Sequence, residues 1–348
     1  MKKIKIITPY LSGNGGTETV LGVVLTNSYI NSNLDLAAYF SGGSNVNWIE
    51  KYKLNHKQFS KCDSSNKVIQ LFALLKNLIT SKDDAIIAMS GKIVFIAYLV
   101  RTIFFKKYQI ISWIHFSIFD EPNVSCKYLH FADKHLAISS GIINQLTKIG
   151  ISKDKCKLIY NPINVSNRKN KFDQESHEIV FIGRPELGGQ KNLKELFSIL
   201  DGLPEDWHMS IYGSGNELVN VKEYISDFHQ INNQVDFMGW VPNPWEKISK
   251  ATVLMLTSKY EGFPMVLLEA LSYGIPVIST DCPVGPADIV QTGVNGFLYK
   301  IGDTDKAQFY LKKVLYTPEV LKFEEISQSV NIFSEKNYEV RFVDAIDE

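Results

Sequence analysis

Two glutamates eight residues apart, Glu261 and Glu269, have the type and spacing best suited to chemistry on a charged ligand. Glu261 lies in a loop after the apolar run 251–257, and Glu269 lies among helix formers that begin at Met265. The first N–H groups of such a helix have no intrahelical partner and favour an anion. The spacing therefore predicts a phosphate-sized site at the helix start, with one carboxylate beside it and the other about one turn into the helix.

The elements that must position these carboxylates form one strand–helix–strand unit of about 30 residues, the usual size for a parallel crossover. Pro264 suits the first helical position, Gly274 suits the helix end, and 275–280 has the pattern of a second buried strand. The alternative is that Glu261 only caps the helix and Glu269 is surface charge. Against it, Glu269 has apolar neighbours in the sequence, and a buried acid is costly unless it has a partner.

Two cations follow another predicted strand, 178–183. Arg184 and Lys191 flank the sequence PELGGQ, just beyond the carboxyl end of that strand. An arginine binds a diphosphate through its fork of N–H donors, and a lysine binds it as a point charge. The pair is therefore a candidate diphosphate clamp, with two solvated loop cations as the alternative.

Glycines at the ends of predicted strands are candidates for close backbone approach to a ligand, or for simple turns. Because their spacing does not match G-x-G-x-x-G, the dinucleotide fingerprint is absent from the first loop. These glycines are Gly13, Gly15 and Gly16 between the strand at 3–8 and a helix predicted at about 18–29, Gly213 after 207–212, and Gly239 after 235–238.

His115 comes directly after the predicted strand 110–114. Open α/β sheets bind their ligands beyond the carboxyl ends of strands, so this position suits a site residue. The alternative is a hydrogen-bonded histidine in the core.

Length and composition predict two domains in a reducing compartment. The chain has 348 residues, enough for two cores. Its 37 cationic and 37 acidic residues cancel, which argues against a generic nucleic-acid binder. The four cysteines are scattered without a C-x-x-C pair, which fits neither a disulfide scaffold nor a zinc site. We expect no signal peptide, because only a short predicted strand follows the first lysines.

A bilayer-spanning helix needs about 20 apolar residues, and no stretch reaches that length. The nearest candidate is 93–105, which contains Arg101 and is followed by Lys106 and Lys107. It is predicted to be a buried or half-buried helix. The alternative is an interfacial helix whose cations, with Lys92, face anionic headgroups.

Alternation of strands and helices predicts parallel sheets in two Rossmann-like halves. The sequence EGFPMVLLEA resembles the retaining family 4 glycosyltransferases of the GT-B fold, and SWIHFS, LAISSGI, YNPI and GVNGFLY extend the resemblance over nearly the whole chain. It implies an α/β fold of two Rossmann-like domains with parallel sheets facing across a cleft. The implied domains are an acceptor-side domain at 1–165, a nucleotide-sugar domain at 166–330, and a tail at 331–348 that packs back on the first domain.

The resemblance also implies roles for the candidate residues. Glu269 would bind the ribose of the nucleotide-sugar, and Glu261 would contact the transferred sugar. Arg184 and Lys191 would stabilise the leaving diphosphate, and His115 would lie near the sugar. The other implied donor contacts are Gly15, Gly16, Gly213, Gly239, Met265, Val266 and Leu267.

The implied activity is transfer of a hexose, galactose as the first expectation, from a UDP-sugar to a lipid-linked or oligosaccharide acceptor. Such a step belongs to bacterial surface polysaccharide or lipopolysaccharide biosynthesis, in the cytoplasm and in peripheral contact with the inner face of the cell membrane. No metal or other cofactor is expected. Although Asp303 and Asp305 form a D-x-D, they precede a helical pattern, so N-capping explains them.

Three other activities fit parts of the pattern. A sugar-nucleotide epimerase of the same fold would release an altered sugar-nucleotide without using an acceptor. A phosphorylase-like enzyme would need a pyridoxal lysine, and none is identified. A non-catalytic nucleotide-sugar-binding partner in a glycan assembly complex would not need the four charged residues Glu261, Glu269, Arg184 and Lys191.

Overall fold

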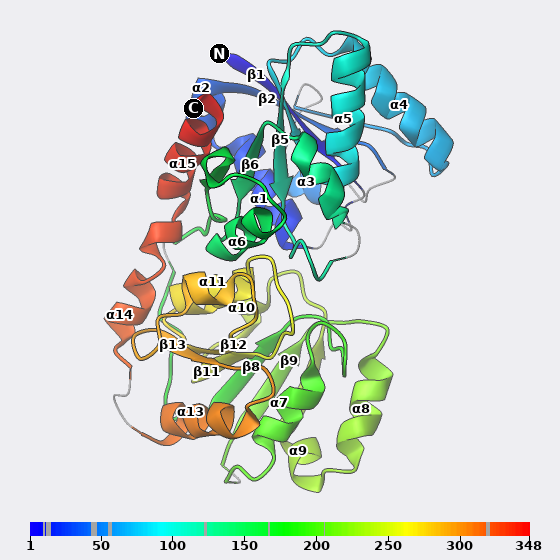
Figure 1. The fold of residues 1–348 in the computed structure, drawn as a ribbon. Helices are drawn as coiled ribbons and strands as arrows, with labels where there is room; N and C mark the ends of the chain where they lie inside the picture. Colours follow the sequence, from blue (N-terminus) through cyan, green and yellow to red (C-terminus); the bar gives the residue numbers. More distant parts are fainter. Residues whose placement is uncertain are drawn as a thin grey trace. The chain divides into compact units, whose positions relative to one another are not determined.

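The computed structural model describes residues 1–9, 11, 15–42, 47–54, 58–121, 124–165, 168–204, 206–317 and 321–348. The chain divides into two compact units (Figure 1). One consists of Met1–Pro162 with Glu335–Glu348, and the other of Ile163–Ser334. In the sequence analysis the boundary lies between 165 and 166, and the tail starts at 331.

The described residues of the first unit form a seven-stranded parallel sheet in the order β3-β2-β1-β4-β5-β6-β7. The strands are β1 (Lys2–Thr8), β2 (Leu34–Phe40), β3 (Phe59–Lys61), β4 (Ala85–Ala88), β5 (Gln109–Ile114), β6 (Lys134–Ala137) and β7 (Cys156–Leu158). The central strand β4 is buried along its whole length, as its continuous apolar run requires in a parallel sheet covered on both faces. The short edge strand β3 is absent from the sequence-based predictions, because it has no alternating pattern.

Helices connect these strands. They are α1 (Gly16–Thr26), α2 (Ser28–Asn33), α3 (Asn47–Lys51), α4 (Lys67–Thr80), α5 (Gly91–Ile103), α6 (Ser140–Lys148) and α15 (Glu335–Asp347), with 3₁₀ turns η2 (Cys126–Phe131) and η3 (Lys153–Lys155). The single helix predicted at about 18–29 is wrong, since α1 ends at Thr26 and α2 starts at Ser28. The cause is Asn27, whose side chain accepts a hydrogen bond from Ile30 N at 2.9 Å and so caps a new helix.

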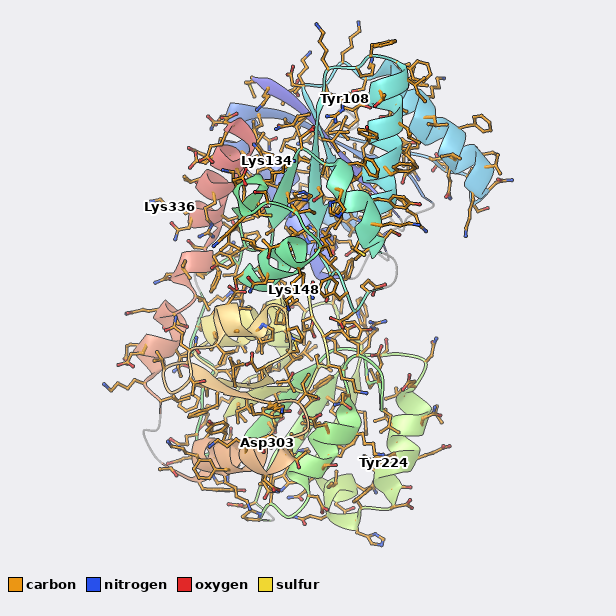
Figure 2. All side chains as sticks on the ribbon, in the orientation of Figure 1. Tyr108, Lys134, Lys148, Tyr224, Asp303 and Lys336 are labelled. Carbon is orange, nitrogen blue, oxygen red and sulfur yellow. The ribbon has the colours of Figure 1, made fainter. Side chains whose placement is uncertain are left out.

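The C-terminal helix α15 belongs to the first unit. Tyr338 and Phe342 of this helix are fully buried. The Lys134 ammonium, on β6, donates to the Ala345 carbonyl at 2.8 Å (Figure 2). Aromatic burial and a buried hydrogen bond therefore attach the end of the chain to its N-terminal unit.

The second unit contains a six-stranded parallel sheet among its described residues, in the order β10-β9-β8-β11-β12-β13. The strands are β8 (Glu178–Ile182), β9 (His208–Tyr212), β10 (Val235–Gly239), β11 (Val253–Leu256), β12 (Val277–Thr280) and β13 (Gly296–Tyr299). Its helices are α7 (Leu193–Leu200), α8 (Leu218–Ser226), α9 (His229–Gln234), α10 (Pro244–Lys247), α11 (Met265–Ser272), α12 (Pro286–Ile289), α13 (Thr304–Tyr316) and α14 (Phe323–Gln328), with the 3₁₀ turn η4 (Asn331–Phe333).

Figure 1 shows α10 and α11 on one face of this sheet and α7, α8, α9 and α13 on the other. Apolar residues of α7, such as Leu196 and Phe197, pack with Phe181 of β8 and Leu311 of α13 in a single buried cluster. Because all strands of the sheet pair in parallel, their carboxyl ends lie at the same edge.

In each sheet the strand order reverses once, between β1 and β4 in the first unit and between β8 and β11 in the second. Loops that leave the two strands at such a switch point diverge to opposite faces, which opens a crevice where open α/β sheets bind ligands. A ligand site in the second unit is therefore expected among the residues that follow β8 and β11.

Candidate functional site

An ion pair joins the two loops at the switch point of the second sheet. Lys191 follows β8, and Glu261 follows β11. The Lys191 ammonium lies 2.7 Å from Glu261 Oε1, and the two side chains are only 15% and 9% exposed. Charges withdrawn from water in this way interact strongly, and they are costly to leave unpaired. The structure thus brings together two residues that the sequence analysis treats separately.

Hydrogen bonds hold the two loops in register. The Thr257 hydroxyl donates to the Lys191 carbonyl at 2.9 Å, and the Gln190 side chain donates to the Tyr260 carbonyl at 2.9 Å. In addition, Lys259 N donates to the Gln190 carbonyl at 2.9 Å. Because these bonds fix the backbone on both sides of the ion pair, its geometry is set before any ligand arrives.

Arg184 lies on the same loop but is exposed. Its Nη2 donates to Gln190 Oε1 at 3.2 Å, and its Nε lies 3.5 Å from Glu186 Oε1. A surface pair of this kind contributes little to stability, so the guanidinium is able to exchange partners at low cost. Arg184 therefore differs from the desolvated Lys191, although both follow β8 as predicted.

Glu269 is held by a residue that sequence reasoning left without a role. The indole N–H of Trp245 donates to Glu269 Oε2 at 2.8 Å. Trp245 is buried and stacks on Tyr273, with ring centroids 5.1 Å apart, and the Arg168 guanidinium lies 4.6 Å from the centre of the Tyr273 ring. This bond accounts for the partner that a carboxylate among apolar residues needs. No spacing in the sequence links Trp245 to Glu269, because the two belong to different crossovers.

The helix α11 begins at Met265, one residue later than predicted, because Pro264 has an extended backbone and takes the N-cap position. Pro264 precedes it and supplies no side-chain cap. Its carbonyl accepts a hydrogen bond from Leu267 N at 3.0 Å. The N–H groups of the first turn, at Met265 and Val266, therefore remain the positive end of the helix dipole. Such a helix start is suited to binding an anion.

Gly213 and Gly239 have structural reasons to be glycine. At Gly213 the backbone has φ +149°, and a Cβ would lie 1.9 Å from the Gly183 carbonyl oxygen. Gly213 N also donates to the Gly239 carbonyl at 2.8 Å. Gly239 itself has φ +69°, with open space where a Cβ would be. The close approach of the chain after β9 to the end of β8 is thus possible only without a side chain.

Gly213→Ala should therefore lower the free energy of unfolding by at least about 3 kcal/mol, through the clash with the Gly183 carbonyl together with backbone strain. Denaturant unfolding of the purified chain measures the change. Gly202→Ala is the matched control, because Gly202 has φ +76° but open space around it and should cost only about 1 kcal/mol. Equal losses for the two variants would contradict the clash.

In the first unit, Gly15 and Gly16 form the start of α1, with Gly15 as the N-cap. A Cβ at Gly15 would lie 2.7 Å from Glu18 Oε2, and Glu18 is buried. The absence of a side chain at Gly15 thus makes room for a carboxylate over the helix start. Gly13, the third glycine of the predicted loop, lies outside the described residues.

His115 follows β5 and is buried beside Trp113, with ring centroids 4.5 Å apart. Among the described residues its Nε2 has no hydrogen-bond partner. Burial lowers the pKa of His115 from its ordinary 6.5 to about 3, because the charged imidazolium would lose its hydration. The ring is therefore neutral near pH 7, and any contribution to a site comes from hydrogen bonding rather than charge.

This burial predicts a pH-dependent stability. Above pH 6.5 His115 is neutral in both the folded and the unfolded chain, whereas between pH 6.5 and about 3 only the unfolded chain binds the proton. We expect the free energy of unfolding to fall by about 1.4 kcal/mol per pH unit over this range from His115. Denaturant unfolding between pH 7.5 and pH 5 should show that the free energy of unfolding falls less steeply in His115→Asn than in the wild type. At pH 7.5 the difference in this free energy between the two proteins gives the packing cost of the substitution alone. An unchanged slope would contradict this origin.

Three further features bear on the sequence-based predictions. Among the residues that the structure describes, no group of three His, Cys, Asp or Glu side chains is placed to hold a metal ion. Asp303 accepts a hydrogen bond from Lys306 N at 3.2 Å and caps α13, which confirms the N-cap interpretation. Over the described part of the chain, no helix has the length and apolarity that crossing a bilayer demands.

Known proteins are similar to this chain over nearly its whole length. A family model described as "Glycosyl transferases group 1" matches residues 163–327. The chain is 32% identical to lipopolysaccharide 1,6-galactosyltransferase of Escherichia coli K12, over 97% of this chain and 95% of the relative. It is also 32% identical to the enzyme of the same name from Salmonella typhimurium LT2, over 99% and 98%.

Solved structures match over the same extent. The apo form of the lipopolysaccharide outer core galactosyltransferase WaaB has a TM-score of 0.86 at 30% identity and 99% coverage of both chains. Anabaena HepE in complex with UDP has a TM-score of 0.79 at 17% identity, with complete coverage of both chains. At this identity the match shows a shared fold only. Two parallel α/β units and these matches define the class as a glycosyltransferase of the GT-B fold.

Within that class, the chain belongs to the group 1 glycosyltransferase family. The expected fold class and enzyme class are thereby confirmed, and the non-catalytic alternative is not supported.

Proposed function

We propose that this glycosyltransferase transfers galactose from UDP-galactose to a saccharide acceptor of bacterial surface-glycan synthesis, with retention of the anomeric configuration. The desolvated Lys191–Glu261 pair at the switch point of the second sheet is the observation that carries the proposal. In this pair the Lys191 ammonium can bind a diphosphate, and the neighbouring Glu261 carboxylate can accept a hydrogen bond from a sugar hydroxyl. The relatives named lipopolysaccharide 1,6-galactosyltransferase support galactose as the sugar.

In this proposal the chemistry is electrostatic. Lys191, Arg184 and the N–H groups at the start of α11, at Met265 and Val266, stabilise the charge that develops on the leaving diphosphate. The N–H of Leu267, which the sequence analysis also expects to contact the donor, instead donates to the Pro264 carbonyl. Glu261 orients the transferred sugar. The acceptor oxygen forms the new bond to the anomeric carbon as the bond to UDP breaks, and a diphosphate oxygen takes the acceptor's proton.

Glu269 has a different role in the proposal, because its carboxylate accepts from Trp245 and is aimed by that bond. It binds the ribose hydroxyls of the donor. Gly213 and Gly239 border the nucleotide through their backbone. A glycosidase-like mechanism with two reacting carboxylates is not proposed, since only one carboxylate serves the sugar.

For the first unit, we propose that Gly15 and Gly16 contact the donor through backbone atoms and that neutral His115 hydrogen-bonds the sugar. The unpartnered Nε2 of His115 supports that role. The acceptor is an oligosaccharide or a lipid-linked glycan. The proposed place of action is the cytoplasmic face of the cell membrane, with peripheral contact.

We also propose that transfer requires no divalent metal, because Lys191, Arg184 and a helix start already supply positive charge for the diphosphate. Treatment of the enzyme with EDTA, which removes divalent metal ions, should then leave kcat/KM within about twofold of the untreated value. The reason is that Lys191, Arg184 and the helix start supply the transition-state stabilisation. Recovery of lost activity on adding Mg²⁺ or Mn²⁺ would overturn this part of the proposal.

The deciding experiment measures sugar transfer to truncated lipopolysaccharide core from UDP-galactose, UDP-glucose and UDP-N-acetylglucosamine, with product linkage by NMR. The proposal expects UDP-galactose to be preferred and the new linkage to be α, as in the donor. A β-linkage would exclude retention. Release of an epimerised UDP-sugar without acceptor would favour the epimerase alternative instead.

A further inference from the structure

Helix α4 exposes apolar side chains along its outer side. Val68, Ile69, Leu71 and Phe72 are all exposed, with Phe72 at 67%. The helix packs on α5 through its other side, and its side chains extend away from the rest of the unit at one edge of Figure 2. Single exposed leucines are ordinary on a protein surface. Four exposed apolar residues on successive turns of one helix form a patch, however, and such a patch indicates an interaction site.

The turn after α5 extends this patch. Phe105 is 88% exposed, and Phe104 beside it is exposed as well. The Lys106 ammonium donates to the Ile79 carbonyl at 2.8 Å, which ties the turn to the C-terminal end of α4. Phe105 has φ +51°, a conformation that glycine usually supplies after a helix. A bulky aromatic side chain is therefore kept fully exposed at a position where it strains the backbone.

The charge around the patch is one-sided, although the whole chain has no net charge. The segments 64–82 and 85–119 contain no Asp or Glu. The two acids between them are occupied, since Asp83 lies 2.8 Å from the Lys5 ammonium and Asp84 accepts a hydrogen bond from Lys3 N at 2.8 Å. The cations of these segments are Lys67, Lys76, Lys82, Lys92, Arg101, Lys106 and Lys107.

We propose that the α4 surface, defined as Val68, Ile69, Leu71, Phe72, Phe104 and Phe105 with Lys67, Lys76 and Lys107, docks on an anionic lipid bilayer. Apolar side chains would enter the headgroup region while the lysines contact anionic headgroups. A protein partner is a poorer fit, because lysine is depleted from protein interfaces. The inference rests on the proposed function, in which the acceptor is found at a membrane.

This assignment differs from the interfacial helix considered at 93–105. Most of that segment lies in α5 (Gly91–Ile103), whose Ile93, Val94, Ala97 and Val100 are buried, and whose Arg101 is bound to Asp133. Its last two residues, Phe104 and Phe105, follow the helix and belong to the α4 surface. The interpretation as a buried or half-buried helix is therefore confirmed for 93–103. The membrane-facing surface moves to α4 and to the turn that follows α5.

Flotation of the full chain with vesicles tests the proposal. Vesicles of phosphatidylcholine alone are compared with vesicles containing 30% phosphatidylglycerol as the probe, at low and high salt. We expect binding that requires the anionic lipid and weakens with salt. Phe72→Ser and Phe105→Gly should each weaken binding by about tenfold, because an apolar side chain no longer enters the interface. Phe105→Gly also removes the backbone strain, so it does not threaten folding.

Phe309→Ser is the matched control, since Phe309 is 56% exposed on α13 in the second unit, and it should bind vesicles as the wild type does. Wild-type binding by both α4-surface variants, or equal binding to neutral vesicles, would overturn the proposal. Self-association that Phe72→Ser abolishes would overturn it too, in favour of a second copy as partner. UDP binding and transfer to a soluble acceptor should be unchanged in both variants. If the proposed function is wrong, the wild type will show no sugar transfer but will still bind anionic vesicles, so the two proposals fail separately.

Discussion

Lys191→Met is expected to lower kcat/KM for sugar transfer by about 10²- to 10³-fold, the scale of removing one group that stabilises charge in a transition state. The reason is the position of its ammonium 2.7 Å from Glu261, at the switch point where the proposed diphosphate binds. Initial rates at saturating acceptor measure the loss. A change of less than fivefold would mean that Lys191 serves only the fold.

The same substitution leaves Glu261 buried without its cation, so stability must be separated from catalysis. Breaking a buried pair costs about 3–5 kcal/mol, whereas removing both charges is often neutral. The double variant Lys191→Met with Glu261→Gln should therefore recover most of the stability lost in Lys191→Met but none of its activity. Recovery of activity together with stability would contradict a catalytic role.

Glu269→Ala should raise the Kd for UDP by about 10- to 100-fold, the range for losing hydrogen bonds to a charged group. Isothermal titration with UDP measures it without any acceptor. Glu269→Gln keeps the shape and should lie between Glu269→Ala and wild type. An unchanged Kd for Glu269→Ala would remove the ribose role.

Trp245 provides an internal check on that prediction, because it acts through Glu269 if it acts at all. Its indole N–H donates to Glu269 at 2.8 Å. Trp245→Phe should weaken UDP binding several-fold in the wild-type background and have no further effect in Glu269→Ala, as expected for coupled residues. Additive effects of the two substitutions would show that Trp245 contacts the nucleotide independently or only packs.

The sequence predicted well those elements whose local signals agree with their surroundings. Helix α11 spans Met265 to Ser272, close to the bounds that Pro264 and Gly274 predict, and Asp303 caps α13 by accepting from Lys306 N. The apolar run 251–257 contains the buried strand β11, and 275–280 contains the buried strand β12. In each case composition, capping and burial favour the same structure.

What the sequence did not predict depends on contacts between distant segments. The bond from Trp245 to Glu269 and the pairing of Lys191 with Glu261 arise from the order of strands in the sheet, which periodicity does not specify. The α4 surface was missed for a related reason. Its apolar residues predict a core helix, and only the packed structure shows which of them remain in contact with water.

The return of α15 to the first unit has a consequence for how the chain matures. Residues 163–334 are contiguous, whereas the N-terminal unit lacks Tyr338 and Phe342 until the segment Glu335–Glu348 has been added. The second unit can therefore fold from one continuous segment, whereas the first unit cannot complete its core until the C-terminal helix is available. Deletion of Glu335–Glu348 would therefore expose the apolar surface of the N-terminal unit on which Tyr338 and Phe342 are buried.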